Sequence, residues 1–76
     1  MKTYTYRIVI EPDEKGYHGF VPLLKGVHTG GKTLEETKEN LQDAIQCHLE
    51  GLLKDHITPP KQSEAIESIQ TFSINA

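Results

Sequence analysis

Cysteine and tryptophan are almost missing from this sequence of 76 residues, which has one cysteine, Cys47, and no tryptophan. A single thiol excludes a disulfide within the chain. A chain this short forms one domain, residues 1–76, which buries only about 60% of its unfolded surface and is marginally stable alone. We therefore expect oligomerisation or a permanent partner.

Long apolar runs and an excess of basic residues are also absent. No stretch approaches the roughly 18 apolar residues of a membrane span, and the N-terminus has no run of signal-peptide type. We therefore expect a cytoplasmic protein with no membrane association. The formal net charge is −3 at pH 7, whereas phosphate-driven nucleic-acid binders usually have a basic face. This charge suits a basic protein partner.

Groupings of residues that carry chemistry are lacking too. The histidines show no metal-ligand spacing, and none pairs with Cys47 in a zinc pattern. They are His18, His28, His48 and His56. Cys47 has no base and no basic surroundings to make it a nucleophile, and Gly30-Gly31 lacks the remainder of a phosphate-binding loop. We expect no metal, no cofactor and no catalytic residue.

Alternation of apolar and polar residues predicts an antiparallel meander in the first part of the chain. Its three strands are predicted at residues 3–11, 17–21 and 27–29. Tyr4, Tyr6, Ile8 and Ile10 share one face of the first strand, and Thr3, Thr5, Arg7 and Val9 share the other. Either of these faces could be the one without a helix. Gly16 is placed to take a positive φ at the end of the hairpin loop, residues 12–16.

One long periodic segment predicts a helix over residues 34–54. Thr33 and Glu36 form a capping box, in which the Thr33 hydroxyl accepts the backbone N–H of Glu36. Gly30-Gly31 before it allows a tight bend, which could be left-handed. The predicted apolar stripe consists of Leu34, Leu41, Ile45, His48 and Leu52. Pro59-Pro60 prevents any continuation of the helix.

The end of the sequence alternates again. Residues 70–74, with Phe72 and Ile74 on one face, predict a fourth strand. A right-handed crossover through the helix would place this strand beside the first and parallel to it. The predicted fold is therefore α+β in the order β-β-β-α-β, with one helix on one face of a small sheet. The other face has no second layer from this chain, so we expect a dimer or higher oligomer.

Several short motifs follow one another in a specific order between about residues 4 and 60. They are Gly16-Tyr17 after an acidic hairpin, Val21-Pro22-Leu23-Leu24-Lys25-Gly26, His28-Thr29-Gly30-Gly31-Lys32-Thr33-Leu34-Glu35-Glu36, Asn40-Leu41 and Ala44-Ile45. Together these motifs resemble the HicB family of antitoxins. The sequence departs from the family pattern at Leu23 and Lys32, where acids are usual, and at Thr37, where alanine is usual.

The resemblance implies a fold similar to a truncated RNase H and a non-enzymatic role in a type II toxin–antitoxin system. The implied partner is a HicA-like toxin, a small basic protein that cleaves mRNA. Family members that repress their own operon carry a DNA-binding domain after this fold. The sequence stops at Ala76, so we expect no direct DNA binding by this chain.

The candidate partner-binding residues come from the loop before the third strand and from the polar face of the helix. They are Leu23, Leu24, Lys25, Glu36, Glu39, Asp43 and Glu50. Two leucines on a tight turn are either tucked under the helix or exposed as a contact, and the sequence leaves both possibilities open.

Two other hypotheses compete with an antitoxin. One is a stand-alone homo-oligomeric structural or regulatory domain without a toxin, which self-associates through its uncovered sheet face or an edge strand. The other is a small metal-dependent nuclease, but Arg7-Ile8-Val9-Ile10 in the first strand lacks the metal-binding aspartate that such catalysis needs. A basic partner that copurifies in a fixed ratio would distinguish the antitoxin from both.

Overall fold

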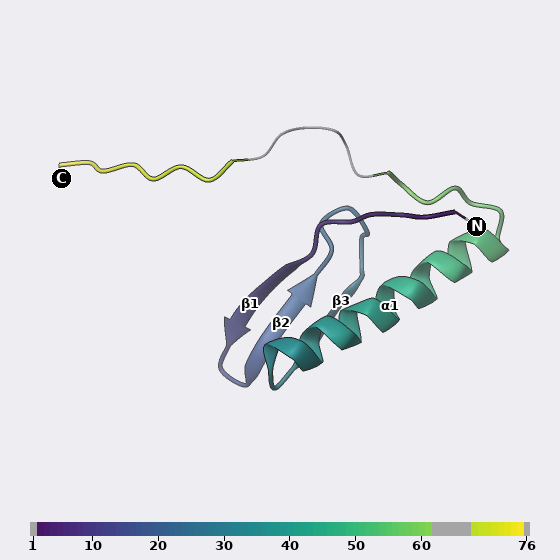
Figure 1. The fold of residues 1–76 in the computed structure, drawn as a ribbon, viewed down its shortest axis with the longest axis horizontal. Helices are drawn as coiled ribbons and strands as arrows, with labels where there is room; N and C mark the ends of the chain where they lie inside the picture. Colours follow the sequence, from purple (N-terminus) through teal and green to yellow (C-terminus); the bar gives the residue numbers. More distant parts are fainter. Residues whose placement is uncertain (1, 62–67, 76) are drawn as a thin grey trace.

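A computed structural model describes residues 2–61 and 68–75. Within these residues the elements are β1 (Val9–Asp13), β2 (Gly16–Phe20), β3 (His28–Gly31) and α1 (Leu34–Lys54). The strands form one antiparallel sheet in the order β1-β2-β3, and α1 packs on one face of it, against β2 and β3 (Figure 1). The predicted α+β fold with one helix on one sheet face is confirmed.

The β1–β2 hairpin is tight. Asp13 pairs with Gly16, and the carboxylate of Asp13 accepts the backbone N–H of Lys15 at 2.8 Å. Gly16 has the predicted positive φ, at +146°. A Cβ at this position would also collide with the carbonyl oxygen of Gly31, so both conformation and space require glycine.

The first strand is shorter than the predicted residues 3–11. Sheet pairing starts at Val9, opposite Phe20, because β2 ends at Phe20 and offers no partner to earlier residues. Residues 2–8 belong to no strand, yet their alternation still decides which side chains face the helix. Tyr6 and Ile10 pack against the core, so the tyrosine face meets α1.

A compact loop joins β2 to β3. The backbone N–H of Val21 bonds to the carbonyl of Val27 at 3.2 Å, and Leu24 bonds to both Val21 and Val27 at 3.1 Å. The loop thereby turns three apolar side chains toward α1, where Val21, Leu24 and Val27 form the core with Leu41. Val27 belongs to this loop, so the third strand begins at His28 and not at residue 27 as predicted.

Gly30 and Gly31, where a tight bend was predicted, are strand residues of β3, and the bend follows them at Lys32 and Thr33. Among the described glycines, positive φ occurs at Gly16 and Gly26, so the left-handed alternative for Gly30-Gly31 is wrong. A Cβ on Gly31 would lie 2.8 Å from both the backbone nitrogen and the hydroxyl of Thr37. The helix therefore starts close above the end of β3, which requires a residue without a side chain there.

Close packing between α1 and β2 decides which helix residues are buried. A Cβ on Gly19 would lie 2.6 Å from Leu41 Cδ1 and 3.2 Å from Thr37 Cγ2. Thr37 is fully buried, and its hydroxyl donates to the Thr33 carbonyl at 2.8 Å. Leu34, predicted in the apolar stripe, is exposed. In the first turns a small threonine fits over the two glycines, where a leucine would not.

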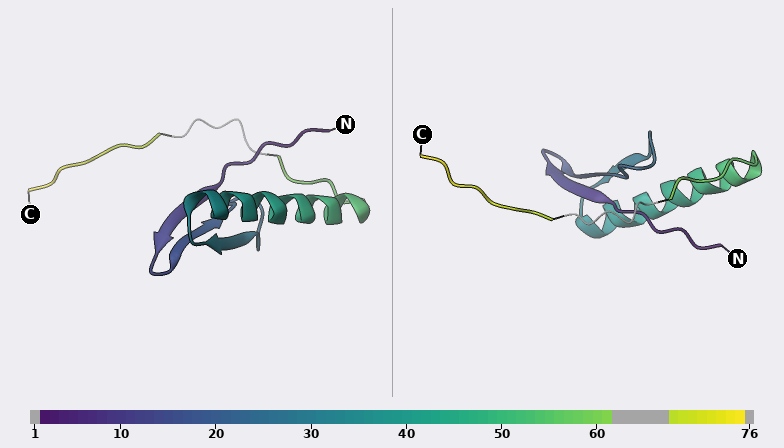
Figure 2. Two further views of the ribbon diagram at one scale, coloured as in Figure 1. Left: turned by 60° about the horizontal axis from the view of Figure 1, so that its bottom comes forward. Right: turned by 90° about the horizontal axis from the view of Figure 1, so that it is seen from above.

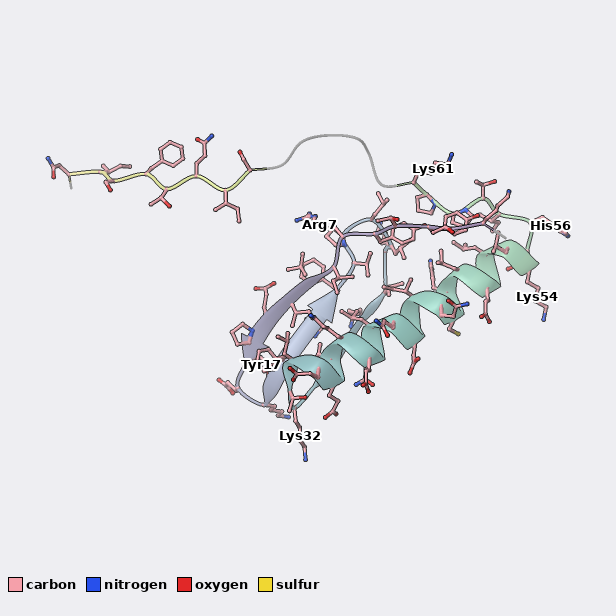
Figure 3. All side chains as sticks on the ribbon, viewed as in Figure 1. Arg7, Tyr17, Lys32, Lys54, His56 and Lys61 are labelled. Atoms are coloured by element: carbon pink, nitrogen blue, oxygen red, sulfur yellow. The ribbon has the colours of Figure 1, made fainter. Side chains whose placement is uncertain are left out.

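Both ends of α1 are capped. At the N-terminus the Thr33 hydroxyl accepts the Glu36 N–H at 3.0 Å, as predicted. At the C-terminus Ile57 N–H bonds to the Leu52 carbonyl and His56 N–H to the Leu53 carbonyl, which is a Schellman motif. His56 has φ +59°, and Figure 3 shows it with Lys54 at this end of the helix.

The His56→Gly variant is expected to be more stable than the parent chain by about 1 kcal/mol, because a left-handed conformation penalises residues with a Cβ. Urea unfolding measured by circular dichroism checks this. His56→Ala retains the Cβ and should show no gain. Equal stability of the glycine variant and the parent would mean that the histidine side chain offsets the backbone strain.

The predicted fourth strand is wrong for this structure. Residues 68–75 form no strand and extend away from the sheet and helix (Figures 1 and 2). Their large apolar side chains are exposed to solvent: Ile69 is 99% exposed, Phe72 78% and Ile74 84%. Alternation identified the strand-forming character of this segment, but it does not specify a pairing partner.

Candidate partner-binding surfaces

Exposed carboxylates line the outer side of α1. Glu36, Glu39, Asp43 and Glu50 are all exposed. They are separated by three, four and seven positions, so they lie on one side of a helix with 3.6 residues per turn. The Glu50 carboxylate accepts a hydrogen bond from the Gln46 amide at 2.8 Å. We call these four residues the acidic stripe; the structure brings them together as the periodicity predicted.

The loop candidates separate into one core residue and two surface residues. Leu24 is buried in the core cluster, so its side chain does not reach a partner in this conformation. Leu23 and Lys25 are exposed. The alternative that sequence left open is thereby decided: one leucine packs under the helix and the other faces solvent.

The loop and the acidic stripe lie on different sides of α1. Leu24 packs in one cluster with Leu41, and Leu41 lies two positions from Asp43, roughly 200° around the helix. The seven candidate residues therefore do not form one continuous surface. A partner that contacts the stripe approaches from the outer side of the helix, away from the sheet.

The sheet face opposite α1 is a second surface, which sequence reasoning located only in part. Register places Val9, Glu11, His18, Phe20 and His28 on this face, and no element within residues 2–61 and 68–75 covers it. The rings of His18 and His28 lie 5.6 Å apart at a tilt of 42°. Ten residues separate them in sequence, so only the strand register, with Phe20 opposite His28, could have revealed the pair.

No metal site emerges from these side chains. In the part of the chain that the structure describes, no group of three or more His, Cys, Asp and Glu residues is placed to hold a metal ion. Cys47 is exposed and free. The described residues also contain no helix long and apolar enough to cross a membrane.

Tyr6 holds the N-terminal segment against the chain that follows the helix. Its hydroxyl donates to the Pro60 carbonyl at 2.6 Å. Between residues 2–6 and 58–61 lies a cavity of about 480 Å³. Burial, and secondarily the neighbouring Tyr4, raises the pKa of Tyr6 above its usual range. The neutral, hydrogen-bonding phenol is therefore the form that folding favours.

The Tyr6→Phe variant is expected to lose about 1 kcal/mol of stability with the hydrogen bond. A raised pKa means that the contribution of Tyr6 is complete below pH about 10 and decreases as the pH rises above it. In urea unfolding between about pH 8 and 11, the free energy of unfolding should therefore decrease more steeply with pH for the parent chain than for Tyr6→Phe. Tyr4→Phe, the same change two residues earlier, should retain the alkaline loss.

The fold places this chain in the class of small α+β domains built from a three-stranded meander and one covering helix. The model of the family described as HicB-like antitoxins of bacterial toxin–antitoxin systems matches residues 6–73. The chain belongs to this family. The predicted resemblance is thereby confirmed.

Individual relatives agree with this assignment. A UPF0150 protein of Synechocystis sp. is 36% identical over 67 residues, which cover 87% of this chain and 85% of that protein. The crystal structure of TTHA0281 from Thermus thermophilus is similar with a TM-score of 0.70 and 40% identity, covering 84% of this chain and 83% of that one. A chain of a HicA3 and HicB3 toxin–antitoxin complex matches with a TM-score of 0.62 and 25% identity, covering 76% and 70%.

Proposed function

We propose that this chain is the antitoxin of a type II toxin–antitoxin system and neutralises a small, basic, mRNA-cleaving HicA-like toxin in the cytoplasm. It acts by binding and not as an enzyme. The observation that carries this proposal is the similarity in fold and sequence to a chain from a HicA3 and HicB3 complex. The family match over residues 6–73 supports the same role.

Charge indicates which surface meets the toxin. The chain has a formal net charge of −3, and the acidic stripe concentrates exposed carboxylates on one side of α1. Complementary charge speeds the encounter of two proteins and fixes their orientation. We therefore assign the toxin contact to the acidic stripe. Leu23 and Lys25 belong to a separate surface, which this assignment does not include.

Co-expression with the short reading frame adjacent to the gene tests the proposal. Affinity purification should yield a complex with a basic protein, and light scattering on a sizing column should give a fixed ratio. The partner alone should arrest growth and degrade mRNA, and co-expression of this chain should reverse both effects. If a HicA-like protein encoded beside this chain neither binds it nor is neutralised by it, the proposal is wrong.

A stand-alone homo-oligomeric domain is the second candidate. The observation that favours it is the open sheet face, which carries Val9, Phe20 and the histidine pair without a covering element among the described residues. A defined homo-oligomer that binds no neighbouring gene product would support this candidate.

A further inference from the structure

The segment 68–75 has the composition of a strand but lacks a strand's environment. Phe72 and Ile74 fall on one side of an extended chain and Ile69 on the other. All three side chains are bare. At about 3.3 Å per residue, these eight residues would span about 26 Å, which is enough to pair along the five residues of β1.

The outer edge of β1 is the complementary surface. Within the described residues β1 pairs with β2 alone, so its other edge presents backbone groups for pairing, apart from the N–H that Pro12 lacks. Beside this edge, on the side that faces α1, Ile8 is exposed and Ile10 is only half-buried. An unpaired edge flanked by uncovered apolar side chains is a template for an added strand.

The two surfaces match in pattern. A strand added at β1 with Phe72 and Ile74 on the side of α1 would extend the layer that contains Ile8 and Ile10. The alternation then places Ile69 on the opposite face, on the side of Val9. Both faces of the added strand would therefore gain apolar contacts, and the backbone groups of β1 would gain partners.

In this structure the segment lies away from the β1 of its own chain. Figures 1 and 2 show it extending past the sheet, so that one molecule presents both an unpaired extended segment and an open sheet edge. In two copies related by a twofold axis, the segment of each copy can pair with the open β1 edge of the other, because each copy provides one strand and receives one. Within the described residues, four apolar side chains form the buried core of a single copy, so a second copy would supply burial that the small chain lacks.

We propose that residues 68–75 of one copy add as a strand to the outer edge of β1 of a second copy, in a reciprocal exchange. This contact involves neither the acidic stripe nor a toxin, so it is independent of the proposed function.

Light scattering on a sizing column, with the full chain in isolation, is the first test. The parent chain should elute at twice the chain mass of 8.6 kDa. The double variant Phe72→Lys/Ile74→Lys should elute as a monomer with unchanged helical circular dichroism. Thr71→Lys/Ser73→Lys adds the same charge to the same segment on the opposite face and should remain a dimer. A monomeric parent, or a dimer that persists in the Phe72/Ile74 variant, would overturn the proposal.

Cross-linking distinguishes exchange from pairing within one chain. In a Cys47→Ser background, one population carries Glu11→Cys, at the middle of β1, and another carries Thr71→Cys. After the two are mixed and refolded together, a short bismaleimide should join them into a heterodimer. In the double variant with both cysteines, the dominant product should have dimer mass. A cross-link confined to single chains would show that the segment pairs with its own β1, and the proposal would be wrong.

The toxin is a third candidate for binding at the outer edge of β1, and adding it to the parent chain and the variant tests this. If Phe72→Lys/Ile74→Lys weakens toxin binding while the parent chain alone is monomeric, the segment serves the toxin contact and the exchange is excluded. If the variant loses the dimer and retains toxin affinity, the result supports the exchange and leaves the proposed function intact.

Discussion

Replacing Leu41 by alanine is expected to lower the free energy of unfolding by about 2–5 kcal/mol, which is the range for truncating a buried leucine. Leu41 is 0% exposed, and its side chain packs directly over Gly19 of β2. A small domain has a total stability of only about 5–15 kcal/mol. The variant should therefore lose much of its folded population at 37 °C, and urea unfolding by circular dichroism measures the loss.

Leu53→Ala provides the matched control, because it makes the same change in the same helix at a position that is 46% exposed. Its expected loss is below about 1 kcal/mol, in line with surface substitutions. A similar loss of stability in Leu41→Ala and Leu53→Ala would indicate that helix propensity, and not core packing, determines the loss. Gly19→Ala tests the contact between Leu41 and β2 from the side of the strand, since its new Cβ would lie 2.6 Å from Leu41 Cδ1.

The helix was the most predictable element because its signals are local. The capping box of Thr33 and Glu36 lies at the start of the helix, and Pro59-Pro60 lie a few residues after its last residue. The observed helix, Leu34–Lys54, has the predicted bounds. The Schellman motif at His56 escaped prediction because glycine, its usual marker, is absent there.

Strand bounds were less predictable because pairing is not local. Alternation marks Tyr4 and Tyr6 as strand-like, but whether they pair depends on where β2 ends, and β2 ends at Phe20. The same limit applies to residues 68–75, whose pattern is that of a strand without a partner in this structure. A period of two residues indicates which side chains share a face, and not which edge receives them.

The candidate partner-binding residues show the same difference between local and non-local signals. The acidic stripe follows from the helical period, and the structure shows its residues exposed on one side of α1. The contrast between Leu23 and Leu24 depends on three backbone hydrogen bonds that close the loop over the core. Hydrophobicity alone cannot separate two adjacent leucines, so sequence left their roles open. Thr37 is not in the predicted apolar stripe, although contact with two glycines makes it fully buried.

Reversing charge within the acidic stripe is expected to slow binding of the HicA-like partner by roughly 10- to 100-fold at low salt, because steering of oppositely charged proteins raises association rates by this order. The variant is Glu39→Lys/Asp43→Lys. These two residues are one helical turn apart and carry like charges before and after the change, so the stability of the helix should be nearly unaltered. Stopped-flow or surface-plasmon association rates at several salt concentrations provide the measurement, and circular dichroism checks the fold.

The control for this prediction must change total charge equally and leave α1 untouched. Glu11→Lys/Glu14→Lys does so on the β1–β2 hairpin, where both residues are exposed. If the stripe is the contact, the helix variant should associate much more slowly than the hairpin variant, and the difference should shrink as salt screens the charges. Because Glu11 lies on the open sheet face, equal slowing in both would exclude the stripe as the specific contact and assign the effect to net charge or to that face. Unchanged binding of the helix variant would remove the outer side of α1 from the interface and leave the open sheet face as the surface to test next.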